Sequence, residues 1–179
     1  MGRWRRVPSW AIERWSRSSG VAGHTDNSIV IDAPPEFVFD VTNDFDRWTK
    51  MFDEYAKVEV LERAGGCVRF RLTTKPDEEG EVHVWTSRRC MDREGLVINA
   101  ERLEPLVPWA EMKIRWDYLP EGGGATRMRW VQDFRIAESL PYTDQQGEDF
   151  INGNSRGEME SIKRYVEKAW SESRSATSR

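Results

Sequence analysis

Residues 81–90 read EVHVWTSRRC and alternate in the way that a β-strand requires. Because successive side chains of a strand point to opposite faces of its sheet, the pattern predicts one face that holds His83, Trp85, Ser87 and Arg89. This face would combine an imidazole, an indole, a hydroxyl and a guanidinium. Aromatic surface with a few polar tips is typical of a pocket wall. The stretch therefore predicts one side of an enclosed site.

The same period of two continues on both sides of this stretch. It predicts further strands over residues 58–63, 67–75, 96–102, 111–118 and 126–136, joined by turns rich in Gly and polar residues. Together with residues 81–90 these form an antiparallel meander, and an earlier strand over residues 27–32 would complete a seven-stranded sheet. One face of the strands is charged and the other is apolar, so a further layer must cover the apolar face.

Helices are expected to supply that layer. Pro34 and Pro35 end the first strand and begin a short helix over residues 36–42, because proline is tolerated in a first helical turn. A second short helix is expected over residues 45–52. A long helix over residues 148–170 has one buried stripe, formed by Ile151, Ser155, Met159, Ile162, Val166 and Ala169. The order predicts an α+β fold in which a seven-stranded antiparallel sheet curves around a long C-terminal helix and encloses a cavity.

Length and charge restrict the class of protein. The 179 residues are about one domain long and carry a net charge of −4. The first 20 residues hold five Arg and one Glu, a net charge of +4, so the remaining residues carry a net charge of −8. This negative charge argues against nucleic-acid binding. We expect residues 1–21 to be an N-terminal extension, either disordered, a short helix over residues 9–17 or a misassigned start. Residues 22–170 would be the folded domain and residues 171–179 a disordered tail.

The sequence has no apolar run of about 18 residues and no N-terminal pattern of a secretory signal. We therefore expect a cytoplasmic protein without a membrane partner. Cys67 and Cys90 are the only cysteines, and the two histidines are far apart in sequence, so no metal site is predicted. If Thr74 pairs with His83 across the hairpin, Cys67 lies opposite Cys90 on the outer face. In a reducing compartment both are expected to be free thiols.

The inner-face rule also predicts which side chains line the cavity. The strands contribute His83, Trp85, Ser87, Arg89, Arg102, Trp116, Trp130 and Gln132, and the segment of the short helices adds Trp48, Phe52 and Tyr55. His83 is either a hydrogen-bonded lining residue or a base. Tyr55 is either a core tyrosine or a pocket residue.

Two inward-facing arginines are the most informative members of this set. A guanidinium cannot lose its charge, so a buried one needs a carboxylate, a water-filled space or a ligand oxygen. Either Arg89 and Arg102 face a ligand, or they pair with acids such as Glu62 and Glu104 and only stabilise the fold. The outer face carries a basic row that is either a solvated surface or a docking patch for an acidic partner: Arg88, Lys113, Arg115, Arg127, Arg129 and Arg135.

Several separated motifs occur in one order along the chain: HTDNSIVI (24–31), DVTND (40–44), Trp48, FDEYA (52–56), FRL (70–72), WTSRR (85–89) and RWVQDF (129–134). Over about residues 22–169 they resemble the single-domain aromatase/cyclases of bacterial type II polyketide synthases. The resemblance implies the helix-grip fold of START and Bet v 1-like proteins. Arg89 matches the position most associated with catalysis in that family, and the positions of Tyr55, Trp85, Ser87, Arg102, Trp130 and Gln132 fall in its pocket.

The resemblance further implies an enzyme that folds a poly-β-ketone on an acyl carrier protein, closes its first ring by aldol condensation and dehydrates it to an aromatic ring. Other synthase subunits would be partners, no cofactor is implied, and the chain would be a monomer or weak dimer. We expect Arg89 to stabilise the developing alkoxide or enolate, and Tyr55, a water or His83 to transfer protons. We favour C9–C14 over C7–C12 closure.

Two departures from the family pattern affect the shape of the pocket. His83 stands where relatives often carry Trp, and the loop over residues 104–109 is expected to carry one extra residue. Two other readings stay open. One is a START-like binding protein that carries a lipid, quinone or polyketide without chemistry, and the other is a cyclase that only folds the chain.

Overall fold

The structure is a computed structural model that describes residues 23–104 and 107–177. It contains one seven-stranded antiparallel sheet in the order β1-β7-β6-β5-β4-β3-β2. The strands are β1 (Gly23–Ile31), β2 (Tyr55–Ala64), β3 (Cys67–Thr74), β4 (Val84–Asp92), β5 (Val97–Arg102), β6 (Trp109–Glu121) and β7 (Ala125–Ile136). Strands β2 to β7 form a meander and β1 joins its far edge beside β7. The predicted sheet is confirmed.

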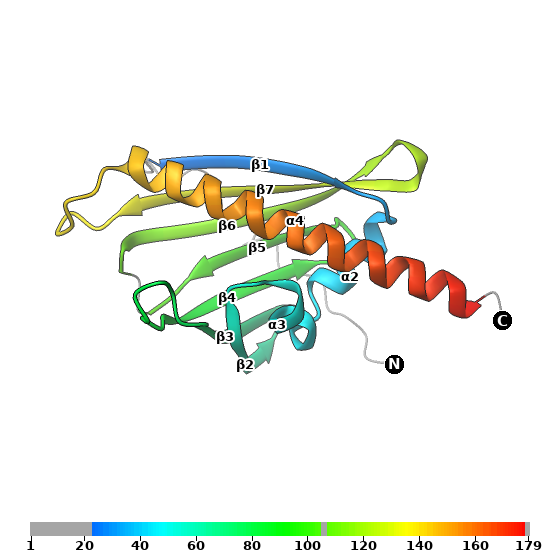
Figure 1. Cartoon of the computed structure of the whole chain (residues 1–179), viewed down its shortest axis with the longest axis horizontal. Coiled ribbons are helices and arrows are strands. Elements are labelled where there is room, and N and C mark those ends of the chain that lie inside the picture. The colour runs from blue at the N-terminus through cyan, green and yellow to red at the C-terminus, as the bar shows by residue number, and fades with distance from the viewer. Residues whose placement is uncertain (1–22, 105–106, 178–179) are drawn as a thin grey trace.

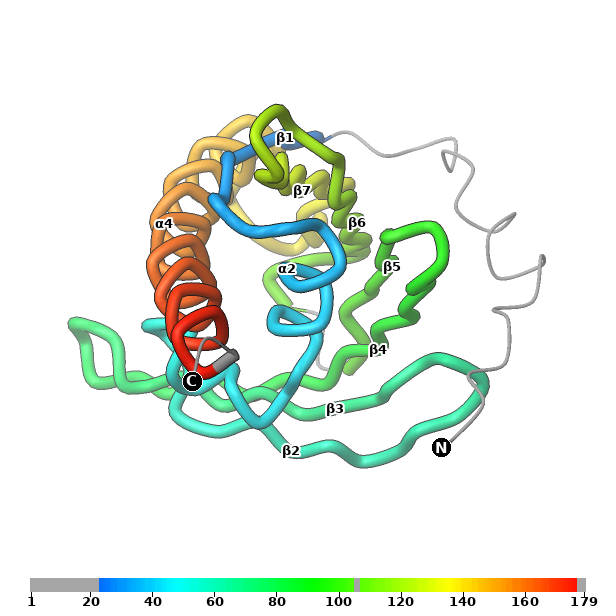
Figure 2. Tube along the Cα trace, turned by 90° about the vertical axis from the view of Figure 1, so that its right-hand side faces the viewer, coloured from blue at the N-terminus to red at the C-terminus, as the bar shows by residue number. Residues whose placement is uncertain are grey.

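The helices cover the concave face of this sheet. The long α4 (Asp144–Thr177) runs along it, as Figure 1 shows. The short α2 (Pro35–Thr42), the 3-10 turn η1 (Phe45–Arg47) and α3 (Trp48–Met51) connect β1 to β2. Viewed from the end, the sheet is curved and α4 runs along its concave side, with α2 beside the two (Figure 2). The helix-grip architecture is therefore confirmed.

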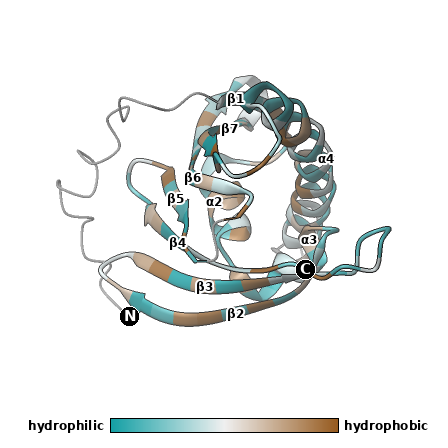
Figure 3. Cartoon of the chain, turned by 90° about the vertical axis from the view of Figure 1, so that its left-hand side faces the viewer, coloured by the Kyte–Doolittle hydropathy of each residue, from teal (hydrophilic) through white to brown (hydrophobic). Residues whose placement is uncertain are grey.

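The amphipathic pattern explains how α4 attaches to the sheet. Its stripe of Ile151, Ser155, Met159, Ile162 and Val166 is buried. Burying apolar area of this kind contributes roughly 25 cal/mol per Å² removed from water. Strands β2 and β3 alternate hydrophilic and hydrophobic residues along their length (Figure 3), as expected for strands with one solvent face.

Phe134 fastens three elements at one end of the molecule. Its ring on β7 is fully buried and lies 5.1 Å from the Trp109 ring of β6 in an edge-to-face arrangement. A Cβ atom at Gly23 would lie 2.4 Å from the Phe134 ring, and one at Gly147 would lie 2.8 Å from it. Only glycine therefore lets the start of β1 and the first turns of α4 close on this ring.

The hairpin between β2 and β3 sets the register of the neighbouring strands. Gly65 and Gly66 adopt φ of 58° and 80°, a left-handed region that favours glycine. The register then places Cys67 opposite Cys90, as predicted.

The prediction of free thiols is wrong for this structure, in which the two residues form a disulfide. Their Cα atoms lie only 3.9 Å apart, a proximity that an argument from the cellular compartment ignores.

Some element boundaries also differ from the sequence-based prediction. Strand β4 begins at Val84, because the Asp77 carboxylate accepts the N–H groups of Glu79 and Glu81 at 3.0 and 2.8 Å and holds them in the preceding turn. Helix α4 continues to Thr177, so most of the expected tail is helical. The predicted N-terminal extension over residues 1–21 lies outside the described residues. Within the described ranges, no helix is long and apolar enough to cross a membrane.

Candidate active site

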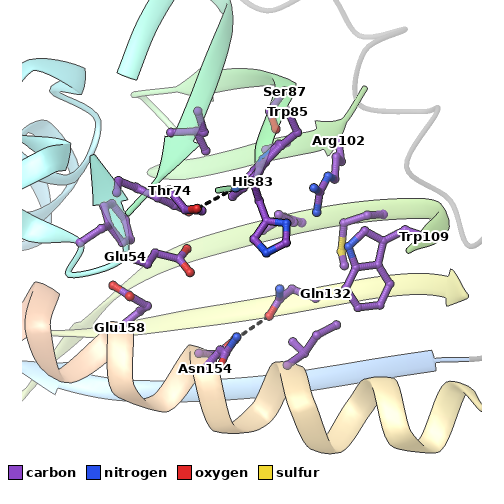
Figure 4. Close-up of a pocket in the computed structure, with 18 of the residues that line it drawn as sticks. Glu54, Thr74, His83, Trp85, Ser87, Arg102, Trp109, Gln132, Asn154 and Glu158 are labelled. Atoms are coloured by element: carbon purple, nitrogen blue, oxygen red, sulfur yellow. Dashed lines mark hydrogen bonds between the residues drawn. The ribbon is translucent and has the colours of Figure 1, made fainter. Parts of the chain in front are cut away.

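A cavity of about 380 Å³ lies between the sheet, the α3–β2 connection and α4. Its wall includes every side chain predicted to line it: Trp48, Phe52, Tyr55, His83, Trp85, Ser87, Arg89, Arg102, Trp116, Trp130 and Gln132. Figure 4 shows several of them pointing into one space. The wall also includes Glu54, Asn154 and Glu158, which the sequence did not single out. Strand alternation found the residues of the sheet but not those of the turn and helix opposite.

Arg89 is the most deeply buried charge of the site. Its residue surface is 2% exposed, and its Nε donates to Asn43 Oδ1 at 2.7 Å. The guanidinium carbon lies 4.1 Å from the centre of the Trp116 ring, close enough for a cation–π interaction. Burial lowers the pKa of Arg89 to about 10, so the group remains a cation at neutral pH. It can therefore stabilise negative charge on a ligand but cannot act as a base.

A small polar network holds the partner of Arg89 in place. The Nδ2 of Asn43 donates to the carbonyl oxygen of Phe39 at 2.8 Å and to the Tyr118 hydroxyl at 3.3 Å. The Tyr118 hydroxyl also lies 2.7 Å from Thr42 Oγ1. These contacts turn the amide oxygen of Asn43 toward Arg89. The network therefore positions the guanidinium without neutralising it.

Neither Glu62 nor Glu104, the two acids that could serve as structural partners, pairs with the buried arginines. The carboxylate of Glu62 lies 3.6 Å from Arg69 instead. Within residues 23–104 and 107–177, no ion pair joins Arg89 or Arg102 to Glu62 or Glu104. The two guanidinium groups are thus left facing the cavity.

An Asn43→Ala variant is expected to lower the rate of product formation about tenfold. Groups that orient metal-ligating side chains are typically worth 10–100-fold in activity, and Asn43 orients Arg89 in a comparable way. Rates would be measured with purified variants, alongside urea unfolding. Asn152→Ala is the control, because its amide oxygen accepts from Asn27 at 2.7 Å on the β1 side. An Asn43→Ala protein with an unchanged rate would contradict the positioning role.

Arg102 and Trp85 form a second cationic site. The guanidinium carbon of Arg102 lies 4.4 Å from the centre of the Trp85 ring, and burial lowers its pKa to about 10. Tyr55 and Glu54 lie near enough to Arg102 to act on it electrostatically. Desolvation, followed by the charge of Glu54, raises the pKa of Tyr55 well above its ordinary value. The Tyr55 hydroxyl therefore stays protonated and serves as a hydrogen-bond donor.

His83 lies at the rim of the cavity and not within a strand. Its side chain is 61% exposed, and its Nε2 lies 3.2 Å from Asp77 Oδ2. Its backbone N–H donates to Thr74 Oγ1 at 2.9 Å, a bond drawn in Figure 4. These contacts favour the hydrogen-bonded lining residue over the base.

The cavity wall presents several buried donors that have no hydrogen-bond partner among the described residues. They are Arg89 Nη2, Arg102 Nε, Trp116 Nε1 and Trp130 Nε1. A buried donor without a partner costs about 1–3 kcal/mol, so a ligand that supplies oxygen acceptors gains by satisfying them. Gln132 differs, because its Oε1 accepts from Ser155 Oγ at 2.8 Å. The wall is suited to a partly flat molecule with several carbonyl groups.

The basic row on the outer face is largely neutralised. Arg88 pairs with Glu101, Arg115 with Asp117, Arg127 with Glu121, Arg129 with Asp26 and Lys113 with Glu111. Such pairs contribute little stability, but they cancel the field of the row. The contacts favour a solvated sheet surface over a docking patch.

Comparison with known proteins agrees with this geometry. Residues 22–167 match the family described as polyketide cyclase / dehydrase and lipid transport. The chain belongs to this family. A protein of Streptomyces cyaneus named "Putative polyketide cyclase" is 46% identical over 149 residues, which cover 82% of this chain and 95% of that one. The granaticin polyketide synthase bifunctional cyclase/dehydratase of Streptomyces violaceoruber is 25% identical over 80% of this chain and 44% of its own length.

Solved structures of aromatase/cyclases share the fold. The Zhui aromatase/cyclase of Streptomyces sp. R1128 superimposes with a TM-score of 0.71 at 24% identity, over 81% of this chain and 93% of that one. The expected kinship with aromatase/cyclases and the expected class of enzyme, a polyketide cyclase, are confirmed.

Proposed function

We propose that this polyketide cyclase closes the first ring of a poly-β-ketone held on an acyl carrier protein and then dehydrates that ring to an aromatic one. The proposal is carried by the buried donors that have no hydrogen-bond partner among residues 23–104 and 107–177, two of them on Arg89 and Arg102. A poly-β-ketone bears carbonyl oxygens at regular intervals and can occupy such donors. We propose C9–C14 closure as the regiochemistry.

The cavity can direct this chemistry mainly by fixing geometry. A carbon between two carbonyls is already acidic, so the difficult part is deciding which carbon meets which carbonyl. An enclosed wall of Trp48, Trp85, Trp116 and Trp130 limits the ways in which the chain can fold. Holding the reacting atoms close together can lower the barrier by several kcal/mol.

Arg89 would bind the carbonyl oxygen under attack. Its positive charge stabilises the alkoxide that forms as the new carbon–carbon bond closes, in a site where water is largely excluded. Tyr55, whose hydroxyl hydrogen-bonds to the Glu54 carboxylate, would lie beside a second carbonyl or enol of the chain. Arg102, above the Trp85 ring, would hold a further oxygen along the chain.

The decisive experiment combines the purified protein with a minimal synthase that makes a carrier-bound poly-β-ketone. The expected result is a faster and more uniform formation of one aromatic product, with the ring position read by mass spectrometry and NMR. A protein that binds the polyketide but leaves its spontaneous product mixture unchanged would support a binding module instead. A product closed at C7–C12 would overturn only the proposed regiochemistry.

A further inference from the structure

Two glutamates that the sequence did not predict as site residues face each other at the edge of the cavity. Glu54 lies in the turn that joins α3 to β2, and Glu158 lies on α4. Both line the cavity, Figure 4 shows them at the same edge of it, and the charge of Glu54 acts on the Glu158 carboxyl group. The two segments are far apart in the chain, so this arrangement exists only in the folded protein.

The turn and the helix are fastened together beside this pair. The Ser161 hydroxyl, one turn of α4 beyond Glu158, donates to Asp53 Oδ2 at 2.6 Å. The backbone N–H groups of Asp53 and Glu54 interact with the Glu158 carboxylate. The other oxygen of that group, Oε2, is buried and has no hydrogen-bond partner in the part of the chain that the structure describes. A carboxyl oxygen is therefore held in place and left available to a ligand.

The charges around the pair make the two carboxyl groups unequal. Glu54 faces Tyr55 of β2, which hydrogen-bonds to it, and Arg102 of β5, and both favour its ionised form. Glu158 faces Glu54 and Asp53, which disfavour its ionised form. Among the described residues, no Lys or Arg forms an ion pair with either carboxylate. These contacts favour the proton on Glu158 over the proton on Glu54.

The titration of the pair agrees with this geometry. Desolvation, with repulsion from Glu54 and Asp53, raises the pKa of Glu158 to about 7. Desolvation also raises the pKa of Glu54 above its ordinary value. Neighbouring carboxyl groups that cannot both ionise are a recurrent arrangement for acid–base catalysis at neutral pH.

We infer that Glu158 and Glu54 form the acid–base pair of this cavity and are catalytic residues for the ring closure and dehydration; the inference rests on the proposed function.

In ring closure, the ionised carboxylate takes the proton from the carbon between two carbonyls. The carbon–carbon bond forms at a carbonyl held by a guanidinium group, and the protonated carboxyl gives its proton to the resulting alkoxide. In dehydration, the pair removes a second proton from the same carbon and protonates the hydroxyl, which leaves as water. No electrons are gained or lost, and the pair returns to one shared proton.

The test uses Glu158→Gln, Glu54→Gln and the control Glu160→Gln, whose side chain lies on the exposed side of α4. With the minimal synthase, each of the first two is expected to lower the rate of aromatic product about 100-fold or more, the range typical of acid–base catalysis. The non-dehydrated aldol product should accumulate. The rate of the wild-type protein should depend on a group that titrates near pH 7, and Glu158→Gln should remove that dependence.

A second measurement separates catalysis from folding. A group whose pKa is raised in the folded state stabilises the protein fully below its unfolded pKa and loses this contribution as pH rises through the folded pKa. The stability of the wild-type protein should therefore fall between pH 4.5 and about 7, and Glu158→Gln should lack that part of the fall. If the variants keep the wild-type rate and pH profile, Glu54 and Glu158 are not the acid–base pair, and the proposed function still stands. A wild-type protein that forms no ring overturns both the pair and the proposed function.

Discussion

An Arg89→Ala variant is expected to form aromatic product about 10²- to 10³-fold more slowly than the wild-type protein, the cost typical of removing one stabilising group from a developing oxyanion. The buried guanidinium holds its positive charge at the cavity wall, where its Nε donates to the neutral amide of Asn43. Rates would be measured with the reconstituted minimal synthase, and the product distribution by liquid chromatography and mass spectrometry.

Arg88→Ala is the matched control for this experiment. Arg88 is the neighbour of Arg89 on β4 but points to the outer face, where it pairs with Glu101. It should keep the wild-type rate. Thermal unfolding of both variants would show whether either loses its fold. An unchanged yield and product distribution with Arg89→Ala would remove this residue from the mechanism. A larger loss with Trp85→Ala would favour a cyclase that only folds the chain.

A Phe134→Ala variant is expected to lower the free energy of unfolding by about 3–5 kcal/mol, the usual cost of removing a fully buried aromatic ring. The loss should be large because Gly23 and Gly147 already approach this ring closely and cannot extend into the space that it leaves. Urea unfolding, followed by tryptophan fluorescence, would measure the change.

Phe150→Ala provides the comparison, since that side chain is 62% exposed. Surface substitutions usually stay within about 0.5 kcal/mol. If the two variants unfold at the same urea concentration, Phe134 does not fasten β1, β6 and α4 to β7 as described. An unchanged slope of the unfolding transition would show that the denatured states are comparable.

Much of the fold follows from local rules. Alternation over residues 56–136 was enough to place the meander, and the stripe on α4 showed what covers it. The start of β4 was predicted three residues early because alternation alone cannot see that Asp77 captures two backbone N–H groups. The disulfide was missed for a different reason, since the register was right but the thiol chemistry was judged from the compartment.

The candidate site divides in the same way. Residues on the sheet, such as Arg89 and Trp130, were found because a strand fixes the face to which each side chain points. Glu54 and Glu158 were missed because they lie in a turn and on the edge of a helical stripe, where periodicity assigns no inward face. Folding brings the two residues together from distant parts of the chain, which periodicity cannot show. The one hint in the sequence was that Glu54 precedes Tyr55, a predicted site residue.

Because indole rings form much of the cavity wall, the tryptophan fluorescence of the protein should depend on which molecule occupies the cavity. Trp48, Trp85, Trp116 and Trp130 surround the space in which the ring would form. A newly aromatic ring absorbs in the near ultraviolet, where indole emits, and energy transfer over such short distances quenches that emission. A linear poly-β-ketone overlaps this emission much less. The fluorescence of the tryptophans that line the cavity should therefore fall when the ring becomes aromatic. Single turnovers could then be followed in real time without a label.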